Sequence, residues 1–315
     1  MDEKDLWFGI FESRQIRQKN INEILDRLAS KKNSANKHLE DRFSNICREM
    51  LMDESQIHSL WLDISEKIEK VKILNDLKIQ FTTRKSINYP KRLIKFRRKE
   101  APYLLYYKGN LDILKRKSIA FSGSRKASKS SLEKTYKIAK ALSDAGYNIV
   151  SGFAKGVDTA AHLGALEGRG TTTVVLSNGI LKFEDSNLRE KIKEQKNIRN
   201  DKMLVISEYP MNMPWFAHNA MNRNWTIASL AEKVFIIESE MDGGTFAMGE
   251  LCLKQKKPLY VQSFNDKEKL PKGNFYLLKN GGKSLEIYLK YLMNRTIDRK
   301  TILNEMNIAD YGTTL

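Results

Sequence analysis

The fold is decided by two stretches of the sequence, SIAFSGSR at residues 118–125 and YNIVSGFAKGVD at residues 147–158. Each begins as a short apolar run, passes through a turn that contains glycine, and leads into a stretch with helical spacing. Short apolar runs with β-branched members are typical of buried strands. The two stretches therefore predict consecutive strand–turn–helix units of a parallel sheet.

The same alternation continues to about residue 262 and predicts an α/β, Rossmann-like fold. Such a fold has a mostly parallel sheet with helices on both faces, and its ligands bind at the edge formed by the carboxyl ends of the strands. The expected strands are residues 118–121, 147–150, 172–176, 204–206, 234–237 and 259–261. The expected helices are residues 129–145, 157–168, 186–197, 219–231 and 245–256, then a loop over 263–274 and a helix near 283–293.

A highly charged segment precedes this pattern. Its apolar residues repeat with the spacing of a helix that buries one face, as in Ile21, Ile24, Leu25 and Leu28. We therefore expect a small helical N-terminal region over residues 1–85 and the α/β domain over residues 86–293. Residues 294–315 are expected to form a short C-terminal tail.

The charge of the chain favours a polyanionic partner. Its 315 residues include 55 Lys and Arg against 38 Asp and Glu, which gives a net charge of +17 and a pI near 9.6. Such an excess of positive charge usually indicates binding to nucleic acid or to another phosphate-rich surface. The alternative explanation is a surface that is rich in lysine without any such partner.

Cysteine usage and the N-terminus suggest a compartment. Cys47 and Cys252 form no Cys-x-x-Cys pair and have no histidine at ligand spacing, so we expect a reducing environment and no metal site. The N-terminus has acids where a secretory leader has bases, and no apolar run reaches the length of a membrane span. We expect a cytoplasmic protein with no membrane association and no cofactor.

Small and polar residues follow the first two predicted strands. Glycines there leave the backbone uncrowded, and hydroxyl, guanidinium and ammonium groups can hold a phosphate at a helix N-terminus. The residues that predict this anion cradle are Gly123, Ser124, Arg125, Ser151, Gly152, Phe153, Lys155 and Gly156. Asp158 either caps the following helix or serves as a ligand, and for His162 a structural hydrogen bond is favoured over a catalytic dyad.

In order and spacing, these motifs resemble the DNA-processing protein A family, also called DprA or Smf. The family pattern combines Tyr-Pro, Leu-Tyr-x-x-Gly, Gly-Ser-Arg, Ser-Gly-x-Ala-x-Gly-x-Asp-x-x-x-His, Ser-Glu-x-Pro and Arg-Asn-Arg. The matching residues are Tyr89-Pro90, Leu105-Tyr106, Gly109, residues 123–125, 151–162 and 207–210, Phe216 and Arg223-Asn224. The resemblance covers about residues 87–262.

The resemblance implies a non-enzymatic protein that coats incoming single-stranded DNA in transformation and helps to load a RecA-type recombinase. It also implies a homodimer. Arg223, Asn224 and Trp225 join the cradle as expected DNA-binding residues, with Phe153 and Trp225 stacking bases. A structural or pocket role is expected for Asp158, His162, Glu238, Gly243, Gly244 and Thr245.

The chain departs from the family pattern at several positions. Trp225 replaces the second arginine of Arg-Asn-Arg, and it either stacks on a base or packs on the sheet. Gln262-Ser263 replace a Pro-Gly pair, and residues 11–15 replace the glycine-rich hairpin of a helix-hairpin-helix. The tail is expected to be too short for a winged helix.

Two other classes of function remain open. A Lonely Guy-type nucleotide phosphoribohydrolase would need a Pro-Gly-Gly-x-Gly-Thr-x-x-Glu loop, whereas residues 242–245 read Asp-Gly-Gly-Thr and Glu250 is displaced by one position. A sensor of a nucleotide signal, or a defence-associated module of the same superfamily, is the other alternative, motivated by the altered N-terminal region.

Overall fold

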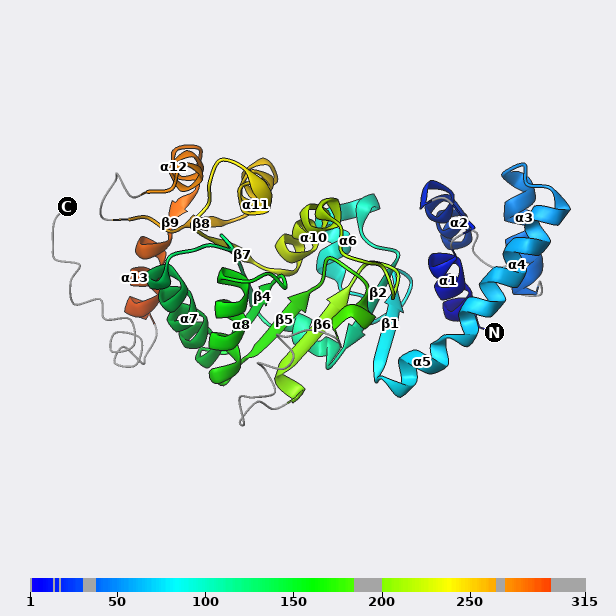
Figure 1. Cartoon of the computed structure of the whole chain (residues 1–315), viewed down its shortest axis with the longest axis horizontal. Helices are drawn as coiled ribbons and strands as arrows, with labels where there is room; N and C mark the ends of the chain where they lie inside the picture. The colour runs from blue at the N-terminus through cyan, green and yellow to red at the C-terminus, as the bar shows by residue number, and fades with distance from the viewer. Residues whose placement is uncertain are drawn as a thin grey trace.

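The computed structural model describes residues 2–13, 15–16, 18–30, 38–183, 200–264 and 270–295. One sheet runs through the described part of the chain, in the strand order β1-β2-β6-β5-β4-β3-β7-β8-β9 (Figure 1). The strands are β1 (Ile79–Thr83), β2 (Leu104–Lys108), β3 (Ser118–Gly123), β4 (Asn148–Ser151), β5 (Thr171–Val175), β6 (Met203–Ser207), β7 (Lys233–Ile237), β8 (Leu259–Val261) and β9 (Lys283–Ser284). All neighbours from β6 to β9 pair in parallel, which confirms the predicted α/β fold.

The six predicted strands are present as β3 to β8, whereas the antiparallel strands β1 and β2 were not predicted. The expectation of helix up to residue 85 is wrong for Ile79–Thr83, which pair with β2. In β1, Ile79 and Phe81 are buried and Gln80 is exposed, so the alternation covers too few residues to separate strand from helix.

The helices are α1 (Glu3–Glu12), α2 (Gln18–Ser30), α3 (Leu39–Glu49), α4 (Glu54–Glu69), α5 (Val71–Asp76), α6 (Lys91–Arg97), α7 (Lys129–Asp144), α8 (Val157–Glu167), α10 (Ala217–Leu230), α11 (Gly243–Lys254), α12 (Lys272–Lys279) and α13 (Leu285–Arg295). The predictions for α7, α8, α10, α11 and α13 are confirmed, and the helix expected at 186–197 lies outside the described residues. The loop expected over 263–274 is wrong at its end, because α12 begins at Lys272, directly after Pro271. Of the tail expected over residues 294–315, the structure describes only residues 294 and 295, which end α13. The rest of the tail lies outside the described residues.

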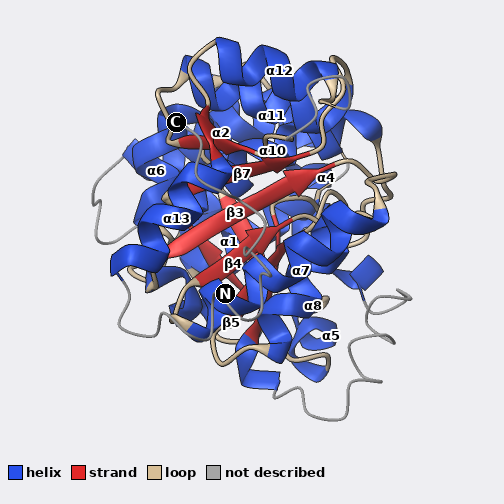
Figure 2. Ribbon diagram, turned by 90° about the vertical axis from the view of Figure 1, so that its left-hand side faces the viewer, coloured by secondary structure: helices blue, strands red, loops and turns tan. Residues whose placement is uncertain are grey.

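Helices cover both faces of the sheet (Figure 2). Successive side chains of a strand point to opposite faces, so Ile119 and Phe121 pack with α7, α8 and α13, whereas Ala120 packs with α10 and α11. Both clusters are almost free of solvent exposure. None of the helices within the described residues has the length and apolar character needed to span a membrane.

The N-terminal helices attach to the sheet through α1. Leu6, Trp7 and Ile10 pack into a core shared with α2, α3 and α4, whereas Phe8 and Phe11 pack against β1 and β2. The ring of Phe8 lies 5.1 Å from Phe81 between centroids. Helix α1 is therefore apolar around most of its circumference because it is buried on two sides.

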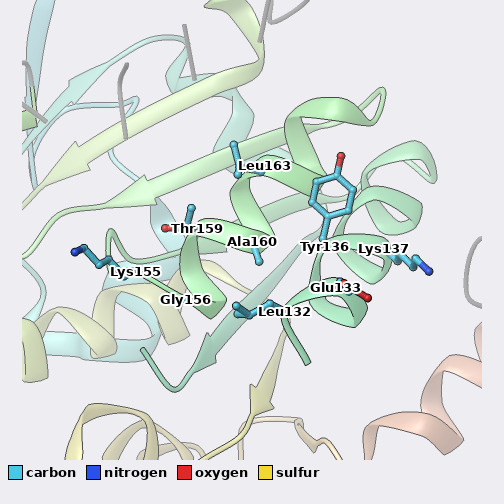
Figure 3. Close-up of a pocket in the computed structure, with 9 residues that line it drawn as sticks. All are labelled: Leu132, Glu133, Tyr136, Lys137, Lys155, Gly156, Thr159, Ala160 and Leu163. Carbon is cyan, nitrogen blue, oxygen red and sulfur yellow. The ribbon is translucent and has the colours of Figure 1, made fainter. Parts of the chain in front are cut away.

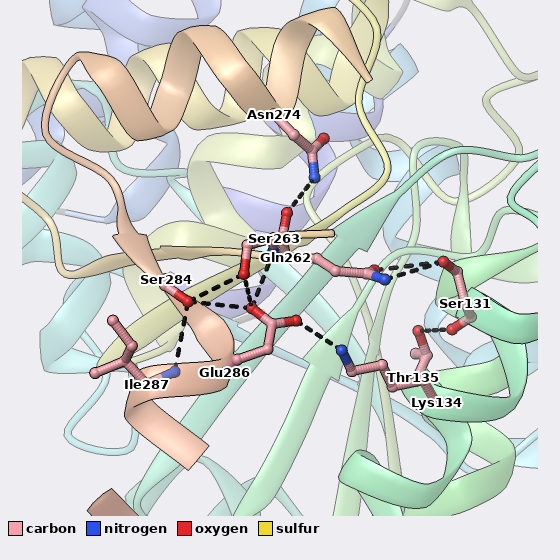
Figure 4. A network of polar contacts seen from close by, with 9 residues as sticks. All are labelled: Ser131, Lys134, Thr135, Gln262, Ser263, Asn274, Ser284, Glu286 and Ile287. Carbon is pink, nitrogen blue, oxygen red and sulfur yellow. Dashed lines mark hydrogen bonds and ion pairs between the residues drawn. The ribbon is translucent and has the colours of Figure 1, made fainter. Parts of the chain in front are cut away.

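A polar seam holds the carboxyl end of β8 between α7, α12 and α13 (Figure 4). Gln262 bonds Ser131 on α7 and accepts, through its backbone oxygen, the amide of Asn274 at 2.8 Å. The Glu286 carboxylate accepts from Ser263 at 2.6 Å and pairs with Lys134 at 2.6 Å. Gln262 and Ser263 therefore form hydrogen bonds that join β8 to the neighbouring helices.

Candidate nucleic-acid interface

The candidate site lies where the order of the strands reverses. The chain runs outward from β3 through β4 and β5 to β6, and then returns to β7 on the other side of β3. In an open parallel sheet, the crevice outside the carboxyl ends of the two strands at this reversal is where ligands bind. The ends of β3 and β7, at Gly123 and Ile237, therefore define the centre of the site.

The turn after β3 is fixed against the end of β7. The Ser124 amide donates to the backbone oxygen of Glu238 at 3.0 Å. Glu238 has a left-handed backbone (φ 43°), and its carboxylate accepts from the Ser128 amide at 3.0 Å and the Ser128 hydroxyl at 2.5 Å. Glu238 thus ties the end of β7 to the start of α7.

The turn after β4 packs directly on the first turn. A Cβ on Gly156, whose φ is +82°, would lie 2.6 Å from the backbone oxygen of Ser124. The Ser151 hydroxyl donates to the Phe121 oxygen at 2.7 Å, and the Thr159 hydroxyl to the Ala154 oxygen at 2.9 Å. The two turns therefore lie in direct contact at this edge of the sheet.

His162 and Asp158 hold the second turn from below. The fully buried His162 ring bonds the Gly152 oxygen at 2.6 Å and the Thr172 hydroxyl at 2.7 Å, and burial lowers the pKa of this histidine. The Asp158 carboxylate accepts from the Ala154 amide, in the loop ahead of α8. Both side chains therefore have hydrogen-bond partners inside the protein.

Arg223 lies beneath the second turn and not on its surface. Only 6% of the residue is exposed, its Nη1 donates to the Val175 oxygen, and its buried Nε has no hydrogen-bond partner. A Cβ on Gly152 would lie 2.1 Å from that Nη1, so this glycine makes room for the guanidinium. Burial lowers the pKa of Arg223, and the nearby Asp158 carboxylate opposes that shift.

The exposed cations of the site are Arg125 and Lys155, one from each turn, with Lys126 beside the first. The Arg125 guanidinium carbon lies 5.9 Å from the centre of the Trp215 ring, which is 51% exposed. Phe216 is 43% exposed and stacks on His218. The site therefore combines free positive charge with aromatic faces that solvent can reach.

Trp215 was not singled out from the sequence. Its signal is the adjacent pair of rings Trp215-Phe216 in the connection between a strand and a helix, where ligand-binding residues of such sheets lie. The connection is anchored in several places. Its Met211 amide donates to the buried Glu12 carboxylate of α1 at 2.7 Å, and Ser207 donates to the Asn178 oxygen at 2.6 Å.

The remaining predicted residues lie apart from these exposed groups. Trp225 is half-buried and packs against the core formed by the sheet, α10 and α11. It is two residues after Arg223 in α10, so the two side chains are separated by about 200° around the helix axis. Asn224 donates to the Gly244 oxygen at 2.9 Å and so joins α10 to the start of α11. Gly243, in a left-handed conformation, and Thr245 belong to that same helix start.

Phe153 is half-buried, and its ring lies 5.3 Å from that of the buried Phe183. Lys155 also borders a hollow of about 580 Å³ on the outer face of α7 and α8. Leu132, Tyr136 and Leu163 give this hollow an apolar lining, with Lys155 at one end (Figure 3). Within the described residues, no group of three or more His, Cys, Asp and Glu side chains is placed to hold a metal ion.

Comparison with known proteins identifies a matching family. The model of a family described as DNA recombination-mediator protein A matches residues 80–294. The chain is 36% identical over 186 residues to DNA processing protein DprA of Streptococcus pneumoniae, which is 58% of this chain and 64% of that protein. It is also 26% identical over 180 residues to protein Smf of Escherichia coli. This match covers 57% of this chain and 47% of that protein. The chain thus spans about half to somewhat under two thirds of these relatives.

Two solved structures resemble the fold. The X-ray structure of DprA from S. pneumoniae superposes with a TM-score of 0.67 and 25% identity, covering 90% of this chain and 95% of that one. A structure of DprA from Helicobacter pylori, described for its unique single-stranded DNA binding mode, gives a TM-score of 0.57 and 24% identity, covering 68% of this chain and 96% of that one.

Proposed function

The chain belongs to the DNA recombination-mediator protein A family, and on that premise we propose that it binds single-stranded DNA along the carboxyl edge of its sheet. The relative from H. pylori is described as binding single-stranded DNA, which supports this ligand. The observation that carries the proposal is the exposed Trp215 ring beside the exposed Arg125 guanidinium at the point of strand reversal. Unpaired bases stack on such rings while cations hold the backbone.

The side chains divide between contact and positioning. Arg125, Lys126 and Lys155 hold phosphates, and Trp215 and Phe216 offer faces to bases. A second set shapes the turns from inside the protein: Asp158, His162, Arg223, Asn224 and Glu238. Gly152 makes room for the Arg223 guanidinium, whereas Gly123 and Gly156 let neighbouring backbone segments approach closely.

The proposal also covers the role of the protein once it has bound single-stranded DNA. The bound strand is protected and passed to a RecA-type recombinase during transformation or repair, a role supported by the description of the family. We also propose that the protein acts as a homodimer and without catalysis or a cofactor. The α/β domain over residues 86–293, together with β1, forms the DNA-binding part, and the N-terminal helices brace it through Glu12.

The test is a titration with oligo-dT, a duplex of equal length and a mononucleotide, each at two salt concentrations. We expect oligo-dT to bind most tightly and its affinity to fall steeply with salt, because phosphate contacts release counterions. EDTA should leave this binding unchanged. Tighter binding of the mononucleotide than of oligo-dT would replace the proposal with a nucleotide sensor.

A further inference from the structure

A second basic surface lies on the opposite edge of the sheet, away from the strand reversal. The parallel neighbours β3, β7 and β8 all begin at this amino edge. Cations directly precede the first and last of these strands and open the middle one: Lys115, Arg116, Lys117, Lys233, Lys256 and Lys257. Since neighbouring strands are about 4.8 Å apart, these residues share one stretch of surface.

Helix α6 adds to this surface and is fastened there. Arg92 donates to the backbone oxygens of Arg116 at 3.2 Å and Leu230 at 3.1 Å, and pairs with Glu232 at 3.2 Å. Lys91 and Lys115 face the same hollow of about 420 Å³, which Leu111 and Leu230 also line. Cations from two separate segments, Lys91 and Arg92 of α6 and Lys115 ahead of β3, therefore border one concave site.

The acids nearby do not cancel this charge. Asp112 pairs with Lys115 at 2.7 Å, with 67% and 79% of the two side chains exposed, an arrangement worth little in water. The Glu232 carboxylate forms an ion pair with Arg92. Arg116, Lys117 and Lys256 are exposed, and no ion pair is recorded for them within the described residues.

Lys257 is a half-buried cation of this surface. Its ammonium lies 4.8 Å from the centre of the Phe96 ring. Burial, with a smaller contribution from Arg92, lowers the pKa of Lys257 to about 8. An anion bound beside Lys257 would favour its charged form and so oppose this shift.

We propose that this surface, the amino-edge patch of Lys91, Lys115, Arg116, Lys117, Lys256 and Lys257, binds the phosphate backbone of duplex DNA. Duplexes are held largely through phosphates, and stacked base pairs offer no face to a side chain. Single strands, in contrast, need exposed rings. The rings beside these cations are covered. Phe96 lies under Lys257 and is half-buried, and Tyr89, which lines the hollow, is buried. Trp215 and Phe216, in contrast, are exposed at the carboxyl edge. One chain can then hold a single strand and a duplex at opposite edges of its sheet.

The test compares two triple variants that remove the same charge. Lys91→Gln/Lys115→Gln/Lys256→Gln removes three of the six charges of the patch, and Lys72→Gln/Lys137→Gln/Lys279→Gln removes three exposed lysines from α5, α7 and α12. Duplex affinity is measured across a salt series. We expect the patch variant to lose at least about tenfold in affinity and about three units of the log–log salt slope, with the control near wild type, because each phosphate contact contributes about 0.9.

Competition separates this proposal from the one for single strands. Saturating oligo-dT should leave the labelled duplex bound, and the patch variant should bind oligo-dT as the control does. Equal loss of duplex affinity in both triple variants, or complete displacement of duplex by oligo-dT, would overturn the amino-edge proposal. Failure of oligo-dT to bind at all would overturn the carboxyl-edge proposal instead and leave the duplex result standing.

Discussion

Three basic residues of the same motif set occupy different environments at the carboxyl edge. Arg125 and Lys155 are exposed, whereas Arg223 is buried against the Val175 oxygen and beneath Gly152. A buried guanidinium can orient a loop but cannot reach a strand in solvent. The contact residues for phosphate are therefore the first two.

Removing either exposed cation should weaken binding of single strands. Arg125→Ala and Lys155→Ala should each cost roughly 1–3 kcal/mol in oligo-dT affinity and lower the salt slope by about one unit, since each loses one phosphate contact. Fluorescence anisotropy over a salt series measures both quantities. Lys137→Ala, which removes an exposed lysine from α7, is the matched control. Wild-type affinity and slope in both site variants would remove these residues from the interface.

The two tryptophans near the site should respond differently. Trp215→Ala should cost roughly 1–3 kcal/mol in oligo-dT affinity with an unchanged salt slope, because stacking releases no counterions. Trp225→Ala should instead lower the free energy of unfolding by about 2–4 kcal/mol, since this ring packs against the core. Urea unfolding and binding titrations on both variants decide the matter. Loss of DNA affinity in Trp225→Ala at full stability would return Trp225 to the DNA-binding set.

The sequence predicts the position of the site residues along the chain but not the contacts that their side chains make with distant segments. It places three glycines at the ends of apolar runs, which is a local signal, and the structure has Gly123 as the last residue of β3 and Gly152 and Gly156 in the loop between β4 and α8. Which group approaches a glycine depends on segments far along the chain, such as Arg223 beneath Gly152. The exposure of Trp215 depends on the anchoring of its loop by Glu12, and no local pattern reports that contact.

Among the elements, the seam between α7 and α13 should depend on pH. Although burial alone would raise the pKa of Glu286, the charge of Lys134 and hydrogen bonds from Lys134 and Ser263 hold it below its usual value. A depressed carboxyl pKa contributes stability above the pKa of the unfolded state, and this stability is lost as the pH falls through the folded-state pKa.

Glu286→Gln should therefore destabilise the protein by roughly 1–3 kcal/mol at pH 7, because Lys134 loses its partner. The difference from wild type should shrink as the pH falls below about 4, where the wild-type carboxyl is also neutral. Urea unfolding at several pH values measures this, with the exposed Glu250→Gln as control. A difference that stays constant down to low pH would show that the ion pair contributes nothing.

Elements were predictable in proportion to their length and burial. The strands from β3 to β8 are apolar runs flanked by turns, and α7 and α8 carry a clear helical period. The antiparallel strands β1 and β2 escaped notice because their pairing partners are set by tertiary packing, with Phe81 opposite Tyr106. Helix α12 is short and starts behind a proline, which reads as loop.

Across the whole molecule, the two edges of the sheet carry different chemistry. The carboxyl edge joins cations to exposed rings, and the amino edge has cations around a hollow with its aromatic side chains covered. The net charge of +17 predicts an affinity for nucleic acid but not this division, because charge counts do not say which edge a residue occupies.

The central claim is that single-stranded DNA lies along the carboxyl edge, and photo-crosslinking locates the strand most directly. An oligonucleotide with 5-iodouracil at each position is irradiated with the protein, and crosslinked peptides are identified by mass spectrometry. We expect the crosslinks in the peptide that contains Trp215 and Phe216, where exposed rings can stack on the modified base. Crosslinks confined to α1–α5 or to the amino-edge patch would contradict the account.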